Sequence, residues 1–562
     1  MNGAQAVIEC LKKENVDLVF GYPGGAVLTL YDAVYKNKFP HILTKHEQGA
    51  VHAADGYARS SGKPGVCFAT SGPGAANLIT GIATANIDSI PLVCITGQVA
   101  TNLIGRDAFQ EADVCGLTAP VTKHNYLVKK VEDLPRVFKE AFYIATTGRP
   151  GPVVIDIAKD VFEKEINFQY PDSVNLRGYK LQVDGNTHDI DNLINAMKEA
   201  EKPVLFVGGG VISSDTAPYI RQIAESTGIP IVDSLMGRGS IECDKDESLG
   251  MVGMHGTYSA NTAVMEADLL IGVGVRFDDR VTGKTSEFAP NAKIAHFDID
   301  SAEISKNIPV DYSVVGDLRW SLPLFAAKLS VISRKLKQQY QPWREYIFDI
   351  KKKNPLAYRQ HSEFIMPEEV ISTVSELSDK DTIVVTDVGQ HQMWAAQYYN
   401  FQKERTFITS GGLGTMGFGL PAALGAKLAN PDKRVVLFTG DGSIMMNCQE
   451  FATIADNDLD VKVVILNNHM LGMVAQWQRM FYNHHYSQSI LRGKTNFVKL
   501  AEAMGVDGIR ITEKADFKAK IQEFLNHEGP AVVDIFIPDE ENVFPMVPAG
   551  GRLDQMVLEA KQ

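Results

Sequence analysis

Short apolar runs that end in glycine-rich loops recur along this chain, and a longer helical pattern follows each of them. The alternation occupies three stretches, which we assign as a first segment (1–165), a middle segment (186–330) and a third segment (362–545), with 546–562 as a C-terminal tail. Strand runs that alternate with helices are typical of parallel sheets covered by helices on both faces. The predicted fold class is therefore α/β, with three doubly wound parallel-sheet domains.

The chain length agrees with this division, because 562 residues are too many for one hydrophobic core. A faint internal repeat adds to it. The strand-like run and Gly-Pro-Gly loop at 65–74 resemble the run and Gly-Asp-Gly loop at 434–442. The first and third segments are thus predicted to share a topology, although so short a repeat can also arise from strand-loop-helix physics alone. The polar stretch from about 330 to 361 is expected to be a connector.

Charge and cysteine usage exclude several classes of protein. A net charge of −13 argues against a nucleic-acid-binding surface, which needs clustered Lys and Arg. The six cysteines form no Cys-x-x-Cys pair, so buried free thiols in a reducing compartment are the favoured interpretation. No apolar run is long enough for a membrane helix, and the first residues lack the layout of a signal peptide. We expect a cytoplasmic enzyme with no membrane or nucleic-acid partner.

Two loops near the C-terminal end predict a site for a metal-bound diphosphate. Gly440-Asp441-Gly442-Ser443 follows one apolar run, and Asn467-Asn468 follows the next. In a parallel sheet both loops would lie at the carboxyl ends of their strands, where ligands bind. Asp441 and Asn468 could then meet over one Mg²⁺, which prefers oxygen ligands, while the glycines let backbone N–H groups approach an anion.

Glu47 lies between the strand-like run 41–43 and a helical stretch. For an isolated glutamate, the plain interpretation is a helix-start carboxylate that favours the positive end of the helix dipole. The loops at 21–25 and 71–74 can likewise be ordinary turns. A thiamine diphosphate (ThDP) cofactor would give both features a function. Its aminopyrimidine needs a carboxyl group sheltered from water, which Glu47 can supply, and its flat ring needs backbone that can approach closely, which the glycine-rich loops can supply.

The chain resembles the catalytic subunit of acetohydroxyacid synthase, also called acetolactate synthase, over nearly its whole length. The motifs that carry the resemblance are Gly-Tyr-Pro-Gly-Gly at 21–25, His-Glu-Gln-Gly-Ala at 46–50, Ser-Gly-Pro-Gly at 71–74, Asp-Ala-Phe-Gln-Glu-Ala-Asp at 107–113, Arg-Phe-Asp-Asp-Arg at 276–280, Asp-Val-Gly-Gln-His at 387–391 and Leu-Gly-Met-Val-Ala-Gln-Trp at 471–477. The third segment also carries the Gly-Asp-Gly to Asn-Asn pattern of ThDP enzymes.

The resemblance implies roles for individual residues at the ThDP site. Glu47 would activate the cofactor, and Asp441, Asn468 and the backbone of Met470 would bind Mg²⁺. Met473 would support the bent cofactor, although a core methionine is its plain interpretation. The further residues implied in ThDP binding are Tyr22, Pro23, Gly24, Gly25, Pro73, Asn77, Gln390, His391, Gly414, Met416, Gly440, Gly442 and Ser443.

Four residues match positions near the substrates. Gln110 and Lys159 would line the substrate channel, and Trp477 and Arg276 would shape the pocket for the second substrate. Without the resemblance, Lys159 would be a surface lysine, Trp477 a core residue and Arg276 an ion-pair partner.

The middle segment lacks a full Gly-x-Gly-x-x-Gly that opens a helix, so NAD is not predicted. The resemblance implies FAD instead, in a largely structural role, because no hydride moves in carboligation. The residues implied are Arg149, Met254, His255, Gly256, Thr257, Gly274, Val275, Arg276, Phe277, Asp278, Asp298, Ile299 and Asp317.

The implied reaction decarboxylates pyruvate and joins the remaining two-carbon unit to a second pyruvate or to 2-ketobutyrate, on the route to branched-chain amino acids. A homodimer or homotetramer and a separate regulatory small subunit are implied as well. Three residues depart from the family pattern: Arg106, Ala158 and Arg238.

Competing interpretations are a catabolic acetolactate synthase, pyruvate oxidase or glyoxylate carboligase on the same scaffold, and a catalytically silent cofactor-binding scaffold. Glu47 argues against glyoxylate carboligase, which resembles the family but lacks that glutamate. The 276–284 block argues against the catabolic enzyme and, together with Trp477, against the oxidase. Intact Glu47, Asp441 and Asn468 argue against the silent scaffold.

Overall fold

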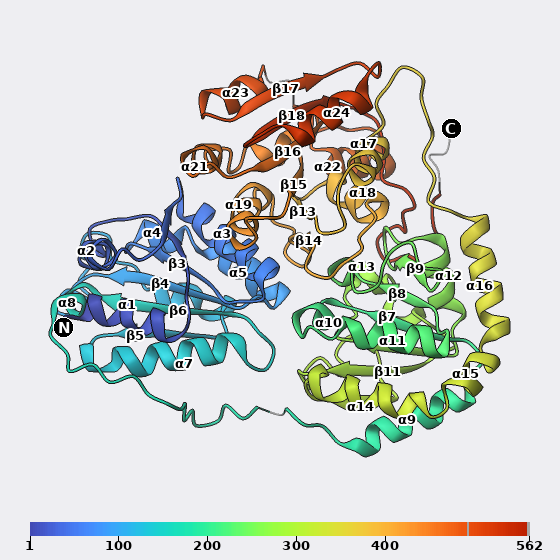
Figure 1. Ribbon diagram of the computed structural model, residues 1–562, viewed down its shortest axis with the longest axis horizontal. Coiled ribbons are helices and arrows are strands. Elements are labelled where there is room, and N and C mark those ends of the chain that lie inside the picture. Colours follow the sequence, from blue (N-terminus) through green and yellow to red (C-terminus); the bar gives the residue numbers. More distant parts are fainter. Residues whose placement is uncertain (182, 492–493, 559–562) are drawn as a thin grey trace.

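The structure is a computed structural model of the chain and describes residues 1–181, 183–491 and 494–558. Three parallel sheets of six strands each, with helices between the strands, make up the molecule (Figure 1). This confirms the predicted α/β fold class. The last residues of the predicted tail, 559–562, lie outside the described part of the chain.

The first sheet has the strand order β2-β1-β3-β4-β6-β5, and all its pairs are parallel. Its strands are β1 Val19–Gly21, β2 His41–Leu43, β3 Gly65–Ala69, β4 Leu92–Gln98, β5 His124–Val128 and β6 Pro152–Ala158. Its helices are α1 Gly3–Lys13, α2 Leu28–Asn37, α3 Glu47–Ser61, α4 Pro73–Ala76, α5 Ile79–Asp88, α6 Val114–Thr118, α7 Leu134–Thr146 and α8 Lys159–Glu163.

The middle sheet has the order β12-β11-β10-β7-β8-β9, which is the doubly wound order of dinucleotide-binding folds. Its strands are β7 Pro203–Val207, β8 Ile231–Asp233, β9 Ser248–Met251, β10 Leu269–Val273, β11 Lys293–Asp298 and β12 Tyr312–Val315. Its helices are α9 Thr187–Glu199, α10 Gly209–Ser213, α11 Ala217–Thr227, α12 Tyr258–Glu266, α13 Asp279–Thr282, α14 Leu318–Ser330, α15 Ser333–Gln339 and α16 Gln341–Lys353.

The third sheet has the order β14-β13-β15-β16-β18-β17, the same pattern as the first, which confirms the shared topology predicted from the short repeat. Its strands are β13 Ile383–Thr386, β14 Phe407–Ile408, β15 Val435–Gly440, β16 Val461–Asn467, β17 Asp507–Ile511 and β18 Ala531–Phe536. Its helices are α17 Pro367–Glu376, α18 Gln390–Tyr398, α19 Gly419–Ala429, α20 Asp441–Ile444, α21 Glu450–Asp456, α22 Gly472–Phe481, α23 Phe497–Ala503 and α24 Phe517–Asn526.

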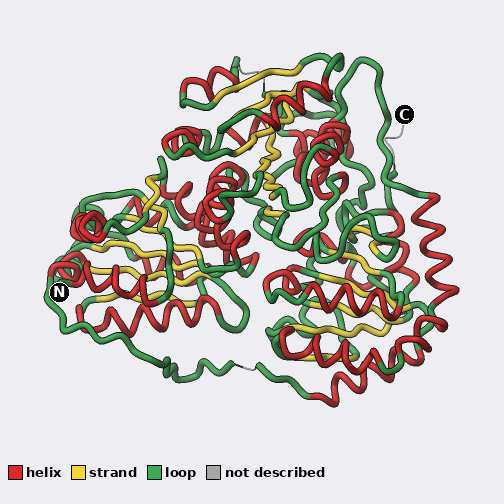
Figure 2. The backbone as a smooth tube through the Cα atoms, viewed as in Figure 1, coloured by secondary structure: helices red, strands yellow, loops and turns green. Residues whose placement is uncertain are grey.

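Helices cover both faces of each sheet (Figure 2). The stretch expected to be a connector contains α15 and α16, and these helices pack against the middle segment. Tyr340, Trp343 and Ile347 are buried in the core of the middle segment, because the helices present one apolar face to it. Among the described residues, no helix is long and apolar enough to cross a membrane.

One core joins the first and third segments. Helices α3 and α19 cross at the centre of the molecule, and residues from both sheets pack around them (Figure 1). Gly56 lies against the Ala422 carbonyl and Gly425 against the Ala53 carbonyl, so that a Cβ at either glycine would overlap the opposite backbone. The glycines thus allow the helices to approach closely.

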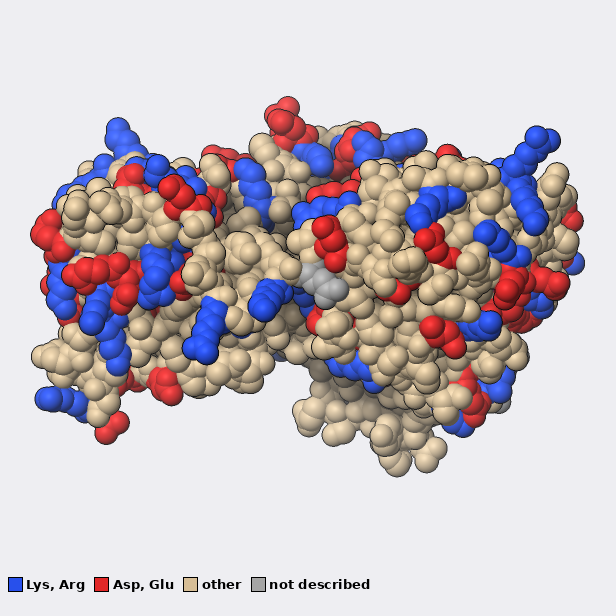
Figure 3. Space-filling model, turned by 90° about the horizontal axis from the view of Figure 1, so that it is seen from below, with Lys and Arg blue, Asp and Glu red and all other residues tan. Residues whose placement is uncertain are grey.

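The underside of the molecule has Lys and Arg side chains intermixed with Asp and Glu (Figure 3). In this view a hollow separates the first segment from the middle segment. The linker from α8 to α9 runs across this face (Figure 1), and its Tyr179 is tied to the first segment by hydrogen bonds to Thr147 and Lys123.

Candidate active site

Strands β15 and β16 bring the two predicted metal-binding loops together. They pair in parallel with Gly440 opposite Leu466, so that Asp441 and Asn468 follow neighbouring strand ends at the same edge of the sheet. This is the arrangement predicted from the apolar runs that precede each loop. The carboxyl edge of the third sheet therefore carries the oxygen ligands that Mg²⁺ prefers.

Asp441 has the surroundings of a cation ligand. Its side chain is buried, one carboxylate oxygen accepts a hydrogen bond from Gly442 N, and burial raises its pKa to about 7. In the described part of the chain no Lys or Arg pairs with it, and no group of three or more His, Cys, Asp or Glu forms a metal site. A buried carboxylate without a cation is costly, so this position fits a metal ion that is completed by an amide, a backbone carbonyl and phosphate oxygens.

The orientation of Asn468 is fixed by two glutamines. Its amide nitrogen donates to Gln390 Oε1 at 3.3 Å, and Gln390 Nε2 donates in turn to Gln476 Oε1 at 2.9 Å. A side chain at Gly472 would overlap the Gln390 oxygen. Because the nitrogen is engaged, the Asn468 oxygen is the atom left for Met470 N and for a metal.

A pocket that is open to solvent lies beside these groups. Every residue that lines it lies between positions 388 and 474, within the third segment. Nine of the predicted cofactor and metal residues, and the predicted support Met473, line it. The lining residues are Val388, Gly389, Gln390, His391, Trp394, Met416, Gly440, Asp441, Gly442, Ser443, Leu466, Asn468, Met470, Leu471, Gly472, Met473 and Val474.

His391 provides a second sign that the pocket takes a polar ligand. The ring is buried, its Nε2 has no hydrogen-bond partner among the described residues, and burial lowers its pKa to about 3. The unpaired nitrogen of this neutral imidazole can form one hydrogen bond to a ligand in the pocket. Gly440 lies against the same ring, where a Cβ would crowd it. These features fit the diphosphate of ThDP.

Glu47 is the first residue of α3 and is largely buried. Asn77, the C-cap of α4, donates from Nδ2 to Glu47 Oε2 at 2.9 Å, and Gly74 leaves space beside Oε1. The predicted residues Pro73 and Asn77 thus begin and end the short helix that contacts the glutamate. One carboxylate oxygen is fixed by the protein, and the other is left for a ligand.

The other predicted residues of the first segment lie at the same edge of their sheet. Loop residues 22–25 follow β1, where Gly24 lies against Thr70 in the loop after β3. Gln110, with a positive φ of 59°, has its backbone against Gly72. Lys159 follows the end of β6 and is exposed, as a residue that meets a substrate needs to be.

The structure does not join the two groups of predicted residues within one chain. Glu47, Gln110 and Lys159 are absent from the lining of the Asp441 pocket. Trp477 is one helical turn beyond Met473, where it packs edge-to-face against Phe481 at 5.5 Å rather than lining the pocket. Gly414, with φ of 68°, lies in the same loop as Met416.

The middle sheet reverses its strand order between β7 and β10, the position where such folds bind dinucleotides. The loops after these strands touch through glycines: Gly210 N donates to Gly274 O at 3.1 Å, and a Cβ on Gly274 would overlap Gly210. Gly274, Val275 and Phe277 follow β10, and Asp298 ends β11. This backbone-lined edge fits the dinucleotide part of FAD.

Several predicted FAD residues also make contacts within the protein. Arg149 pairs with Glu303 at 2.7 Å, and Arg276 lies 3.7 Å from Asp278. Asp317 caps α14 and pairs with Arg319. His255 lies 3.3 Å from the Pro545 carbonyl, and Thr257 caps α12. Met254, Gly256 and Ile299 are not exposed.

Arg238, one of the departures from the family pattern, forms a buried ion pair with Asp233 at 3.0 Å and lies over the Phe401 ring. Arg106 is exposed, whereas Ala158 is buried as the last residue of β6.

Comparisons with known proteins agree with this geometry. Residues 1–117 match the family described as thiamine pyrophosphate (TPP) enzyme, N-terminal TPP binding domain, residues 190–325 its central domain, and residues 387–535 its C-terminal TPP binding domain. The chain is 47% identical over 566 residues to the acetolactate synthase large subunit of Haemophilus influenzae, covering 100% of this chain and 99% of the relative.

The chain belongs to the acetolactate synthase family. The isozyme 3 large subunit of Escherichia coli is also 47% identical, with 99% of this chain and 98% of the relative covered. The chloroplastic acetolactate synthase of Arabidopsis thaliana is 47% identical over 99% of this chain and 84% of the relative.

Among the residues of this acetolactate synthase family member to which the sequence analysis gave no role, Trp394 lines the pocket and Gln476 holds the lining residue Gln390. Gln476 carries no signal, since a polar residue inside a helix is ordinarily exposed, yet here it is buried and fixes Gln390. Trp394 lies in the helix that begins with Gln390, and its spacing from His391 could have indicated that it shares the pocket face.

Proposed function

We propose that this chain is the catalytic subunit of an acetolactate synthase, which decarboxylates pyruvate and joins the two-carbon unit to a second 2-ketoacid. The identity of 47% to large subunits over the full length carries this conclusion. ThDP, Mg²⁺ and FAD are its cofactors, and pyruvate or 2-ketobutyrate is the acceptor. Its products are 2-acetolactate and 2-aceto-2-hydroxybutyrate. The free state of the six cysteines supports a cytoplasmic location.

When bound, ThDP supplies the electron sink that lets a 2-ketoacid lose CO₂. Asp441, Asn468 and the Met470 carbonyl would hold the Mg²⁺ that neutralises the diphosphate, with His391 and the 440–443 loop around it. Met473 would support the cofactor from the pocket wall. Together these residues would hold the cofactor and orient it for reaction.

Glu47 performs the proton step. Because Asn77 engages Oε2, Oε1 is the Glu47 atom that would hold or release a proton beside a bound cofactor. Gln110 and Lys159 would then contact the carboxylate or carbonyl oxygen of the substrate. Trp477 and Arg276 would shape the space for the second 2-ketoacid, where one additional methylene is worth about 1–3 kcal/mol of discrimination.

The functional unit in this proposal is a homodimer, which can double to a tetramer, because Glu47 of one copy must meet the Asp441 pocket of the other. Large apolar side chains are exposed next to both groups of site residues, which is expected of a surface that a second copy of the chain covers. They are Tyr22, Leu28, Leu43 and Phe109 in the first segment, and Leu413, Met445, Met446, Val474 and Phe481 in the third. Relatives are named large subunits, so we also propose a regulatory small subunit.

The test is to incubate the purified chain with pyruvate, ThDP, Mg²⁺ and FAD and to measure acetolactate after its acid-driven conversion to acetoin. We expect product from the native chain and a loss of about 10²-fold or more in Glu47→Gln, because the amide cannot exchange the proton. Thermal unfolding of the variant controls for misfolding. Acetaldehyde or acetyl phosphate as the product would instead indicate a decarboxylase or an oxidase on this scaffold.

A further inference from the structure

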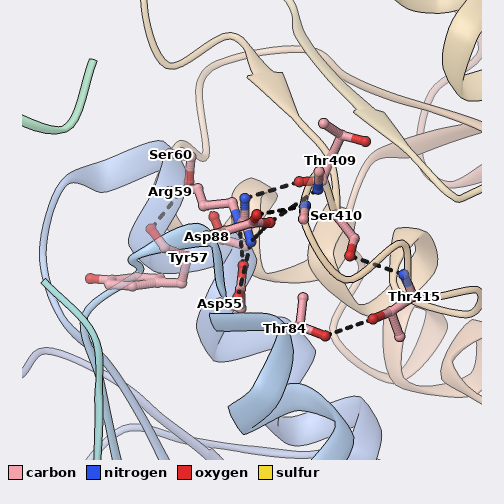
Figure 4. Close-up of polar contacts among 12 residues, drawn as sticks. Asp55, Tyr57, Arg59, Ser60, Thr84, Asp88, Thr409, Ser410 and Thr415 are labelled. Atoms are coloured by element: carbon pink, nitrogen blue, oxygen red, sulfur yellow. Dashed lines mark hydrogen bonds and ion pairs between the residues drawn. The ribbon is translucent and has the colours of Figure 1, made fainter. Parts of the chain in front are cut away.

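A buried cluster of three charged side chains lies where the first segment meets the third (Figure 4). Arg59 on α3 forms ion pairs with Asp55, one turn earlier, and with Asp88 at the end of α5. The side chains are at most 5% exposed. The cluster carries one net negative charge, and a buried charge of this kind needs additional hydrogen-bond donors.

Those donors come from one loop of the third segment, residues 409–417. Gly411 N and Gly412 N donate to the two oxygens of Asp88 at 3.0 and 2.8 Å, and Arg59 Nη1 donates to Thr409 O at 2.9 Å. Thr84, four residues before Asp88 on α5, lies 2.7 Å from Thr415 through the two hydroxyl oxygens. Helix α5 of the first segment therefore holds the loop at three points (Figure 4).

Ordering this loop is costly in conformational entropy. It contains four glycines, of which Gly414 and Gly417 have φ of 68° and 86°, and it has no helix or strand of its own. Glycine-rich backbone loses the most conformational entropy on ordering. The third segment holds the two ends of the loop: Gln392 Nε2 donates to Thr409 Oγ1 and Ser410 O, and Asp387 accepts from Gly417 N. Within the loop, Thr415 N donates to Ser410 Oγ, whereas Gly411 N and Gly412 N are bonded from the first segment.

The loop delivers Met416 to the wall of the Asp441 pocket. Met416 lies between Thr415, which contacts Thr84, and Gly417. Its position thus depends on contacts made by α5 of the same chain, which takes no part in lining the pocket.

We infer that Asp88 is a positioning residue for the cofactor pocket: through Gly411 and Gly412 it orders the 409–417 loop, and Arg59 and Thr84 assist it. The first segment then has two tasks. It supplies Glu47 to one site, and it preforms the pocket wall of the third segment in its own chain. This inference rests on the proposed function only where it concerns the affinity for ThDP.

The experiment compares Asp88→Asn with the native chain, both freed of cofactors. The amide keeps the size of the side chain but lacks the charge, and its NH₂ group opposes the glycine N–H donors. We expect the Kd for ThDP, measured calorimetrically with saturating Mg²⁺, to rise about tenfold or more, since hydrogen bonds to a charged group are among the stronger ones.

A second measurement, amide hydrogen exchange, tests the inference with no cofactor bound. Amide hydrogen exchange of peptides that cover 409–417 should become faster in Asp88→Asn, while peptides from the middle sheet stay as in the native chain. Glu140→Gln is the matched control, because Glu140 is a largely buried carboxylate paired with Arg136 on α7 of the same segment. It should lower thermal stability without changing exchange at 409–417 or the Kd for ThDP.

Thr84→Val is the second variant, in case Asp88→Asn fails to fold. It keeps the shape of the side chain and removes one hydroxyl contact, so we expect a Kd about threefold higher and faster exchange at 409–417. A Kd for ThDP within twofold of the native value, together with native exchange rates at 409–417, would overturn the inference. The Arg59 cluster would then only stabilise the packing of the first segment against the third. If the native chain fails to bind ThDP, the proposed function fails, whereas the exchange data still decide whether Asp88 orders the loop.

Discussion

At the scale of single residues, buried polar groups in the third segment serve different purposes. His391 Nε2 has no hydrogen-bond partner among the described residues, and Asp441 is a buried carboxylate; both line a pocket, where a ligand or a metal ion can bind to them. Glu368, at the start of α17, is also buried and leaves Oε2 without a partner among the described residues, but it does not line the pocket. Its effect is on stability rather than on ligand binding.

Burial raises the pKa of Glu368 from 4.5 to about 8, so the folded chain keeps a proton that the unfolded chain releases. The stabilising contribution is complete below pH 4.5 and is lost as the pH rises through 8. Glu368→Gln stays neutral throughout. We expect its Tm, relative to the native chain, to rise by about 2 °C or more between pH 5 and pH 9.

Calorimetric scans across this pH range measure the difference. Glu376→Gln, an exposed position at the other end of α17, is the control. A Tm difference for Glu368→Gln that does not change with pH would show that the carboxyl is not protonated at neutral pH.

At the scale of elements, the crossing of α3 and α19 is controlled by two glycines. Gly56 and Gly425 each touch the backbone of the other helix. At an exposed position inside a helix, Gly→Ala raises the stability of the protein by up to about 1 kcal/mol, because alanine has the higher helix propensity. Here the methyl group would force the helices apart.

Gly56→Ala is therefore expected to destabilise the protein by about 1–3 kcal/mol, because overpacking outweighs the gain in helix propensity. The measurement is the Tm of the cofactor-free chain. Gly25→Ala, where no atom lies within 4 Å of the added methyl, should leave the Tm nearly unchanged. Equal Tm values for Gly56→Ala and the native chain would contradict a close crossing.

The sequence predicted the elements that have strong apolar runs. Strands β7, β10, β11, β15 and β16 match, to within two residues at either end, the apolar runs 203–207, 269–275, 294–299, 435–438 and 461–466, which predict strands. Edge strands such as β14, with two residues, and β17, with a polar sequence, have no such signal, since one side of an edge strand needs no apolar partner.

The candidate site likewise contains residues that the sequence predicts and residues that it does not. Loops that follow strong strands, such as Gly440–Ser443 and Asn467–Asn468, could be predicted because a parallel sheet places them at one edge. Gln476 and Asp88 could not be predicted, because their contacts are with residues far away in sequence and their local patterns are those of ordinary helix residues.

At the scale of the whole molecule, the two groups of predicted site residues lie apart within one chain. Glu47 and the Asp441 pocket belong to segments that share a core within the chain, yet the glutamate is not in the pocket lining. A chain with Glu47→Gln and a chain with Asp441→Asn should therefore complement each other.

Co-expression with two different affinity tags allows the mixed dimer to be purified. One of its two sites would combine the intact Glu47 of one chain with the intact Asp441 of the other, so we expect roughly half of the native specific activity. Dimers of either variant alone are the controls and should be nearly inactive. A mixed dimer as inactive as the controls would place each site within a single chain.

The matching strand orders of the first and third sheets extend to the way the two segments pack together. Helices α3 and α19 follow equivalent strands, β2 and β14, and their contacts are reciprocal: Gly56 meets Ala422, and Gly425 meets Ala53. Reciprocal contacts between equivalent elements are the signature of a twofold interface. The chain thus contains, within one polypeptide, a pseudo-twofold interface between two domains of the same topology, one of which carries Glu47 and the other the Asp441 loop.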